Sequence, residues 1–523
     1  MSRPPQGLYT REDWPRIPGA TLRRRRFGPD LVELDCDVVV VGSGAGGAVV
    51  AAELAEGGLD VIVLEEGGYH PTESFTPDAD DAIRRLYRDG GAIMALGAPP
   101  VTYSEGRCVG GSTVINGGMT WKTPPRILER WAREDWIDGI SPAAMEPVFA
   151  RVERFLHAAH QDPWTIGRDN ALLKEGADKK AWEVVDNVRD QLHCAGTNNC
   201  AFGCPTAAKR STLVTYLPRA LHFGARVLAN CRVTRLLRER KRVLGVEGRI
   251  VRHDARDGLA FQVRAPQVVL AAGAVHTPGI LFRSGVRSPS GRLGKNLSLH
   301  PNVKVTALFD EEIRGWEGVH QAYQVREFQR EGLVFAAVNI PPSIAAMTLP
   351  YYGDELREIM DGYSRMLIAG MLLEDTETGV VRDLAGRPQA FYQLSDLDAE
   401  RLVHGTALLC ELLFEVGARR IVLPFEGIPD LRGPEDVRRL YAQKVDKARM
   451  EVVTVHIMGT CAAGEDRARH VCDSYGRVYD AEGLVVADAS LFPSPIGVNP
   501  METIMALATR NAAAILDGAR VPS

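Results

Sequence analysis

The sequence of 523 residues contains no apolar run that approaches the roughly 18 residues a transmembrane helix needs. It also shows no signal peptide, because the arginine run at 23–26 is followed by Gly28, Pro29 and Asp30 and not by an apolar segment. We interpret the arginine run as a solvated charged surface. These absences predict a protein that lacks a transmembrane anchor and is located in the cytoplasm.

An excess of basic residues is absent too. Lys and Arg number 62 against 67 Asp and Glu, which gives a net charge of −5. Proteins that bind nucleic acid usually carry a basic excess, so no nucleic-acid partner is expected. No internal repeat is apparent, and hydrophobic residues make up 45% of the chain, which excludes a disordered protein.

Cysteines are few and scattered. There are nine, an odd number in a long chain, which is not a disulfide framework. Cys194, Cys200 and Cys204 do not follow a zinc-binding spacing, and no pair of histidines lies near them. We therefore expect packed free thiols and no metal site.

Glycine, in contrast, is abundant, with 51 residues, and three of them follow a strand-helix-strand pattern. Buried strands are predicted at 37–41 and 60–64, with a helix at 45–56 between them. This alternation predicts a βαβ unit with a parallel sheet.

The turn between the first strand and the helix carries Gly42, Gly44 and Gly47 in the pattern G-x-G-x-x-G. The first glycine permits a tight turn, the second a close approach to a pyrophosphate, and the third close packing of helix and strand. The helix N-terminus adds N–H donors. Glu65 ends the second strand near the position expected for the acid that binds a ribose hydroxyl. The sequence therefore predicts a dinucleotide site.

This fingerprint alone does not distinguish NAD from FAD. Two later segments, 267–273 and 483–490, are further buried strands that end in small residues, and the second contains Asp488. A nucleotide site near the N-terminus that is completed by a segment near the C-terminus is typical of FAD enzymes of the glutathione-reductase type. An NAD(P)-dependent dehydrogenase with an ordinary Rossmann domain is the alternative.

The other expected elements are mixed. Helices are predicted at 126–133, 146–159, 402–417 and 501–516, and strands at 227–238, 262–270, 302–308, 333–338 and 484–487.

Several segments resemble the glucose–methanol–choline (GMC) oxidoreductases, which are FAD-dependent alcohol oxidases and dehydrogenases. Residues 106–116 and 273–286 are similar to the two signatures of that family, and 294–301 is similar to the segment that follows the second. Residues 456–460, and Asn499 with Pro500, resemble its catalytic pair. These matches lie in the family's order from about residue 35 to the end of the chain.

The pattern and the resemblance together imply an α/β fold. It consists of a Rossmann-like FAD-binding domain of the glutathione-reductase type and a second α+β substrate domain on a mostly antiparallel sheet. We expect an N-terminal arm at 1–35. The FAD-binding domain is expected at 36–125, 206–300 and 453–523, and the substrate or cap domain at 126–205 and 301–452.

The resemblance implies that His456 and Asn499 are catalytic. Oxidation of an alcohol removes a hydroxyl proton and a hydride, and histidine suits the role of a general base at neutral pH. We therefore interpret His456 as the base, and Asn499 as a donor to the developing alkoxide. The flavin accepts the hydride. His276 and His300 are expected to be structural.

The loop at 109–118 is expected to wrap the flavin, with Asn116 near the hydride-accepting nitrogen and Asp488 at the ribityl or pyrophosphate region. Ile115 stands where some family members carry a histidine bonded to the flavin, so we expect non-covalent FAD. Further residues assigned to the cofactor are Gly110, Gly111, Ser112, Val233, Gly273, Ala489, Pro500 and Met501.

Residues 200–211 and 497–501 look most like the long-chain fatty alcohol oxidases, and the sterol oxidases are similar there. The expected substrate is therefore a hydrophobic long-chain, terpenoid or sterol-like alcohol. A sugar or aryl alcohol stays open, as does a cyanohydrin lyase on the same scaffold, and the electron acceptor is oxygen or another molecule. A non-enzymatic binding module is least favoured.

Overall fold

The computed structural model describes residues 4–26, 28–251, 257–428, 430–442 and 444–520. The predicted βαβ unit is present as β4 (Val38–Val41), α1 (Ala45–Glu56) and β5 (Val61–Leu64), and the two strands pair in parallel. Every residue of both strands is buried, as expected for a sheet that is covered on both faces.

Four more strands complete a six-stranded parallel sheet around this unit. Its order is β1 (Leu8–Tyr9), β11 (Arg226–Leu228), β5, β4, β15 (Gln267–Leu270) and β26 (Leu484–Val486). The helix α1 packs against α6 (Tyr216–His222) and α12 (Met501–Arg520). The last strand comes from near the C-terminus, as predicted for a nucleotide site of the FAD type.

A five-stranded sheet packs beside it, through contacts between its β13 and the strand β15. Its order is β12 (Cys231–Glu239), β13 (Arg242–Val251), β14 (Asp257–Arg264), β3 (Leu31–Asp35) and β2 (Thr21–Arg23). The expected N-terminal arm is therefore corrected, because β1, β2 and β3 are built into the two sheets.

Two predicted strands are each divided in two. The strand expected at 227–238 becomes β11 and β12 in different sheets, because the chain turns at Asn230, whose φ is +61°. The strand expected at 262–270 is broken at Pro266, which has no N–H to donate to a ladder.

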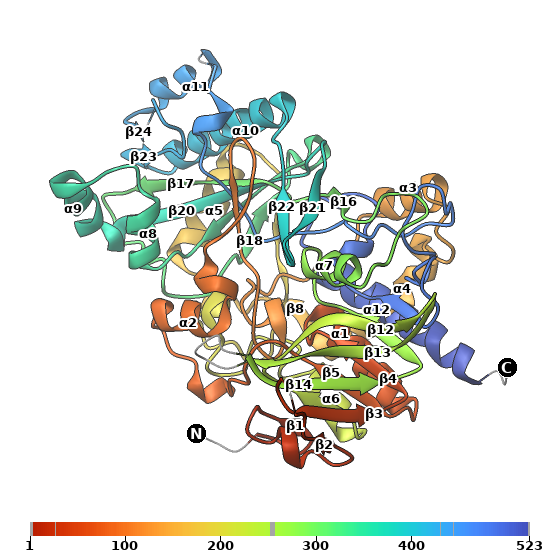
Figure 1. Cartoon of the computed structure of the whole chain (residues 1–523). Helices are drawn as coiled ribbons and strands as arrows, with labels where there is room; N and C mark the ends of the chain where they lie inside the picture. Colours follow the sequence, from red (N-terminus) through yellow and green to blue (C-terminus); the bar gives the residue numbers. More distant parts are fainter. Residues whose placement is uncertain (1–3, 27, 252–256, 429, 443, 521–523) are drawn as a thin grey trace.

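The second body is built on a mostly antiparallel sheet of ten strands, as predicted (Figure 1). The main path is β6 (Ile93–Ala95), β7 (Val101–Tyr103), β25 (Val452–Thr454), β17 (Asn302–Leu308), β20 (Met366–Leu373), β19 (Leu333–Val338), β18 (Tyr323–Val325) and β9 (Val184–Asp186). The strands β23 (Arg420–Val422) and β24 (Asp430–Leu431) extend it beside β17. One face packs against α5 (Arg168–Lys179) and α10 (Asp396–Glu415).

The remaining helices and strands lie outside the three sheets described so far or cover them. The helices are α2 (Ala79–Leu86), α3 (Pro125–Glu134), α4 (Pro142–Leu156), α7 (His276–Arg283), α8 (Pro342–Thr348), α9 (Gly353–Asp361) and α11 (Arg438–Ala442). The strands β16 (Lys295–Leu297), β21 (Gly379–Leu384) and β22 (Arg387–Phe391) form one sheet, and β8 (Ala158–His160) and β10 (Val188–Asp190) another.

The buried apolar residues form two large clusters, which divide the chain differently from the expected boundaries at two places. Helices α3 and α4 contribute to the cluster of the six-stranded sheet, although 126–205 was expected in the substrate domain. Strand β7 belongs to the ten-stranded sheet, although 36–125 was expected in the FAD-binding domain.

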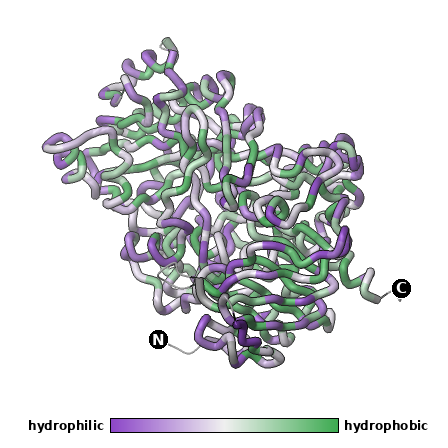
Figure 2. The backbone as a smooth tube through the Cα atoms, in the orientation of Figure 1, coloured by the Kyte–Doolittle hydropathy of each residue, from purple (hydrophilic) through white to green (hydrophobic). Residues whose placement is uncertain are grey.

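Hydrophobic segments concentrate in the strands of both bodies, while the outer loops are more hydrophilic (Figure 2). Among the residues that the structure describes, no helix combines the length and the hydrophobicity of a membrane span.

Candidate active site

The first glycine turn has the close backbone contacts that its sequence predicts. Gly42 has a φ of +101°, and a Cβ there would stand 2.3 Å from the carbonyl oxygen of Ala271. A Cβ on Gly47 would stand 2.0 Å from the carbonyl oxygen of Gly42. Gly44 is the N-cap of α1 and provides no capping side chain, so the first N–H groups of the helix face the turn without one. This arrangement fits the pyrophosphate of a dinucleotide.

A fourth glycine of this turn was missed by the sequence analysis. A Cβ on Gly46 would stand 1.6 Å from the carbonyl oxygen of Ala487, at the end of β26. Gly46 therefore lets the helix α1 contact the strand that comes from near the C-terminus. The sequence could have indicated this contact, because Gly46 is a glycine at a position where the motif G-x-G-x-x-G allows any residue.

The second glycine loop meets the first. Gly110 and Gly111 have φ values of +97° and +54°, and a Cβ on Gly111 would stand 2.9 Å from the Cα of Gly44. The N–H of Gly110 donates to Ser43 Oγ over 2.9 Å. Ser112 follows and is exposed, and its hydroxyl accepts from the N–H of Gly106. The two loops that were assigned to one cofactor thus share a contact.

Glu65 links the first turn to the end of β5. Its Oε2 accepts from the N–H and the hydroxyl of Ser43 over 3.1 and 2.6 Å, and its Oε1 accepts from the N–H of Gly67 over 2.8 Å. Burial raises the pKa of this carboxyl group. Since each carboxylate oxygen offers two acceptor positions, Oε1 keeps one for a ribose hydroxyl.

Asp488 has a different role from the one expected. One oxygen accepts from the N–H of Gly273 and the hydroxyl of Thr277, and the other from the N–H and the hydroxyl of Ser490. These four donors fill the acceptor positions of the carboxylate, so no position is left for a cofactor group. Asp488 instead positions the ends of β15 and β26. A Cβ on Gly273, whose φ is +88°, would meet no atom within 4 Å, so the chain passes open space here.

The other residues assigned to the cofactor divide into two groups. Asn116 lies in the second loop, and its amide is 3.0 Å from the sulfur of Met501, which begins α12 after Pro500. Lys209 is buried and donates to the carbonyl and the side chain of Asn116, which fixes this loop. The second group is buried in the apolar cluster around the six-stranded sheet. It consists of Val233 on β12 and Ala489, which directly follows Asp488.

The structure brings His456 and Asn499 together, as predicted, and adds a third residue, His300. The Nε2 of His456 is 3.3 Å from the amide of Asn499, and its Nδ1 is 3.2 Å from the Nδ1 of His300. Both histidines are buried. His300, in the segment 294–301, was expected to be structural, and its contact with His456 was not predicted.

These hydrogen bonds assign the protons of the histidine pair. Burial lowers the pKa of His456 to about 4 and the pKa of His300 well below its usual value, so both rings are neutral near pH 7. The Nε2 of His300 accepts from the N–H groups of Ile496 and Gly497 over 3.3 and 3.1 Å. His300 therefore carries its proton on Nδ1 and donates it to His456 Nδ1. Neutral His456 must then carry its own proton on Nε2, the atom that faces Asn499.

The amide of Asn499 agrees with this assignment only after it is rotated by half a turn about its last side-chain bond. Its Oδ1 is buried without a hydrogen-bond partner, while its Nδ2 faces His456. Oxygen and nitrogen of an amide are assigned from their hydrogen bonds, and a rotated amide would let Oδ1 accept from His456 Nε2–H.

The segment that carries His300 is itself fixed by polar contacts. Asp375 accepts from the N–H groups of Leu299 and His300 over 3.0 and 3.3 Å, and burial raises its pKa to about 7. Thr454, two residues before His456, donates to the carbonyl oxygen of Leu299. Both histidines therefore lie on restrained backbone.

Among the described residues, no three His, Cys, Asp or Glu side chains are grouped as a metal ion would require, Cys194, Cys200 and Cys204 included. Cys200 is buried, and its sulfur accepts from Arg189 over 3.4 Å. The sulfur of Cys204 accepts from the N–H of Lys209 over 3.4 Å, and Cys194 is partly exposed.

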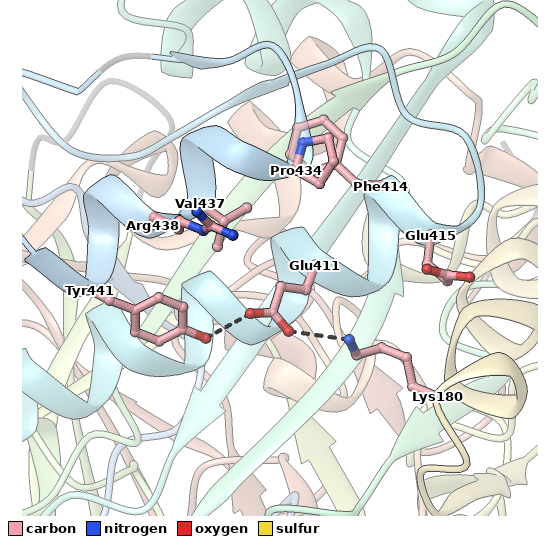
Figure 3. A pocket seen from close by; sticks show the side chains of 8 residues that line it. All are labelled: Lys180, Glu411, Phe414, Glu415, Pro434, Val437, Arg438 and Tyr441. Carbon is pink, nitrogen blue, oxygen red and sulfur yellow. Dashed lines mark hydrogen bonds and ion pairs between the residues drawn. The ribbon is translucent and has the colours of Figure 1, made fainter.

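A pocket of about 330 Å³ lies elsewhere, between α10 and α11 (Figure 3). The hydroxyl of Tyr441 donates to Glu411, which also accepts from Lys180. The lining of this pocket contains none of the predicted site residues.

The chain is similar in sequence to proteins of one known family. Residues 83–302 and 379–508 each match a family model described as GMC oxidoreductase, and residues 37–75 match the FAD binding domain. The chain is 35% identical over 488 residues to an uncharacterised GMC-type oxidoreductase of Sinorhizobium fredii, covering 93% of this chain and 95% of the relative.

Two more distant proteins are also similar. A long-chain-alcohol oxidase of Arabidopsis thaliana is 28% identical, over 92% of this chain and 66% of the relative. The solved structure of pyridoxine 4-oxidase from Mesorbium loti superposes with a TM-score of 0.67 at 18% identity, covering 92% of this chain and 99% of that one. At this identity the superposition supports the fold alone.

Proposed function

The chain belongs to the GMC oxidoreductase family and uses FAD, and from this premise we propose that it oxidises the CH–OH group of an alcohol to an aldehyde or ketone. The observation that carries the proposal is the group of His456, Asn499 and His300. It presents hydrogen-bonding atoms from two neutral side chains to one place, which suits a substrate oxygen.

The residues present fit FAD. The glycine turns at Gly42–Gly47 and Gly110–Gly111 contact one another, the N-terminus of α1 has no side-chain cap, and the chain passes open space at Gly273. Glu65 would hold the ribose, and Asn116 and Met501 lie together at the second loop. When bound, FAD accepts the hydride from the carbon that carries the hydroxyl. Ile115 offers no atom for a covalent bond, so we propose that the cofactor is held non-covalently.

We propose that His456 binds the substrate oxygen as a donor. The interpretation of His456 as a general base requires an unprotonated Nε2, whereas the bond from His300 leaves the proton of neutral His456 on Nε2. A donor at this point stabilises the negative charge that develops on the oxygen, and Asn499 can supply a second donor. The hydroxyl proton is released to water, while the hydride leaves from the carbon that carries the hydroxyl. His300 is a positioning residue that holds His456 in this tautomer.

For the substrate class, we propose a hydrophobic alcohol with a long aliphatic chain or a terpenoid or sterol-like body. The similarity to the long-chain-alcohol oxidase of Arabidopsis thaliana supports it. The apolar residues Ile368, Leu372 and Val334 on β20 and β19 also support it, because they share one face of the ten-stranded sheet. Oxygen or another molecule as acceptor, and location in the cytoplasm, stay predictions.

The test is anaerobic mixing of the purified protein with a panel of primary and secondary alcohols. We expect a yellow protein whose flavin absorbance near its visible maximum is lost with at least one alcohol and returns with oxygen or a dye acceptor. A protein that cleaves a cyanohydrin while its flavin stays oxidised with every alcohol would contradict the proposal and favour the lyase.

A further inference from the structure

The face of the ten-stranded sheet opposite α5 and α10 carries two polar residues of β17, Asn302 and Lys304, which we call the polar column. The register pairs Asn302 with Leu372 and Lys304 with Gly370 across β17 and β20, and directly paired residues point to the same face. Val303 and the other alternate residues of β17 belong to the core on the helix side. Asn302 and Lys304 therefore point away from the helices.

This column starts beside the catalytic residues. Asn302 also pairs with Val453 of β25, and His456 lies three residues farther along that segment. Two residues along a strand span roughly 7 Å, so Lys304 lies about that distance beyond Asn302. The column therefore leads away from His456 along β17.

Lys304 is a cation without a close partner. It forms no hydrogen bond or ion pair with any residue that the structure describes, although the exposed Glu451 attracts it. Its side chain is only partly covered, yet burial lowers the pKa of its ammonium group. The ammonium group therefore loses part of its hydration without an ion pair that replaces it, which suggests that an anionic ligand completes this site.

Neighbouring side chains offer further hydrogen bonds at the same place. The amide of Asn302 can donate through its Nδ2, while its Oδ1, an acceptor, is buried without a hydrogen-bond partner. The charge of Lys304 contributes to the lowered pKa of His320, whose Nδ1 accepts from the N–H of Asn339 over 3.5 Å. Burial lowers the pKa of His320 to about 3, so the ring is neutral and its proton is on Nε2.

His320 also connects this group of side chains to the flavin loop. A Cβ on Gly117 would stand 3.0 Å from Cδ2 and 3.6 Å from Nε2 of His320. Gly117 follows Asn116 in the loop that was assigned to the flavin. His320 therefore lies against the loop that was assigned to the flavin, and the charge of Lys304 acts on this ring.

Resting on the proposed function, we propose that the substrate is a hydroxycarboxylate, an alcohol whose far end carries a carboxylate that Lys304 binds. Its hydroxyl lies at His456 and Asn499, and the aliphatic part runs along β17 past Asn302, which pairs with Leu372. An ammonium group beside amide and imidazole donors suits an anionic oxygen, and an unsubstituted alkanol would leave the ammonium unpaired.

The test compares matched substrates that differ only in the charged end. The flavin reduction rate is measured anaerobically with 6-hydroxyhexanoate against 1-hexanol, and with 12-hydroxydodecanoate against 1-dodecanol. We expect the second-order rate constant of flavin reduction to be higher for the hydroxy acid in at least one pair. In Lys304→Met this preference should fall about 10- to 100-fold, as expected for loss of a charged hydrogen bond, while the alkanol rate stays within about twofold.

Two further variants and a binding measurement sharpen the result. Lys304→Arg should retain part of the preference, and Lys295→Met, an exposed lysine on β16, should retain all of it. Titration with hexanoate, followed by the flavin spectrum, should show weaker binding in Lys304→Met and unchanged binding in Lys295→Met.

The outcomes separate this inference from the proposed function. If alkanols reduce the flavin as well as the hydroxy acids do, or if Lys304→Met slows both equally, the hydroxycarboxylate inference is wrong and alcohol oxidation stands. If hexanoate binds through Lys304 but no alcohol of any kind reduces the flavin, the proposed function is wrong and the anion site stands.

Discussion

His300 makes two different bonds with its two ring nitrogens, and two substitutions can remove them one at a time. In His300→Gln, the amide oxygen can replace Nε2 and accept from Ile496 and Gly497, but the donor to His456 Nδ1 is lost. In His300→Asn, the shorter amide can donate to His456 Nδ1, but the two backbone N–H groups lose their acceptor. The two variants should therefore affect different properties.

The magnitudes follow from the burial of these groups. Each orphaned backbone N–H costs about 1–3 kcal/mol, so His300→Asn should lose several kcal/mol of a total stability of about 5–15 kcal/mol. His300→Gln should lose less stability. Loss of the neutral hydrogen bond that selects the tautomer of His456, worth about 0.5–1.5 kcal/mol, should slow flavin reduction roughly 2- to 12-fold in His300→Gln.

Urea unfolding, followed by the release of flavin fluorescence, measures the stability, and anaerobic stopped flow measures the reduction of the flavin. We expect His300→Asn to have the lower urea midpoint and His300→Gln the slower reduction. The reverse order, with His300→Gln reduced at the wild-type rate, would refute the assigned tautomer.

Three other predictions concern the cofactor and the fold. Acid or heat should release all flavin from the polypeptide, because Ile115 cannot bond to it; flavin that stays with the denatured chain would contradict this. Gly46→Ala should abolish FAD binding or folding, because its Cβ would stand 1.6 Å from the Ala487 oxygen, whereas Gly518→Ala on α12, with no atom within 4 Å, should be neutral. Burial without hydrogen-bond partners raises the pKa of Glu502 to about 8, above the usual value of about 4.3 in the unfolded chain. Between these two pKa values the native state holds a proton that the unfolded chain has lost. The free energy of unfolding of the wild type should therefore fall as the pH rises from about 4.3 to about 8, by at most about 1.4 kcal/mol per pH unit. Glu502→Gln should show a flatter pH profile in urea unfolding, and an identical profile would show that Glu502 is not the cause.

Much of the fold could be predicted because its signals are local. The run of four valines before Gly42, the helix after Gly44 and the buried strand before Glu65 define the βαβ unit by periodicity and turn chemistry alone. Asn230 and Pro266 could have indicated that the strands expected at 227–238 and 262–270 end there. Apolar residues alternate on both sides of each position, however, and this pattern predicts one continuous strand. The N-terminal strands were missed because β1 and β2 are only two and three residues long. The strand β1 pairs with β11, far away in the chain, and β2 pairs with β3, which in turn pairs with the distant β14.

The sequence predicted the residues of the site better than the positions of the protons on its histidines. His456 and Asn499 stand out by motif, but the bond between His456 and His300 joins residues 156 positions apart. The two N–H groups that fix the tautomer of His300 come from a third segment. Asp488 likewise looked like a cofactor ligand until its four donors, which come from three residues, were brought together by β15 and β26.

The donor role of His456 in alcohol oxidation is tested most directly by one comparison in the reductive half-reaction. The wild type, His456→Ala and His456→Gln are mixed anaerobically with a substrate alcohol, and the rate of flavin bleaching is measured. The alcohol deuterated at the carbinol carbon serves as a control that hydride transfer limits the rate.

We predict that His456→Ala is slower by about 10²–10³-fold, the usual effect of removing one oxyanion donor, and that His456→Gln recovers at least tenfold because its amide donates. Asn499→Ala should lose a similar 10²–10³-fold. His456→Ala reduced at the wild-type rate would remove His456 from the reaction, and His456→Gln as slow as His456→Ala would contradict the donor role.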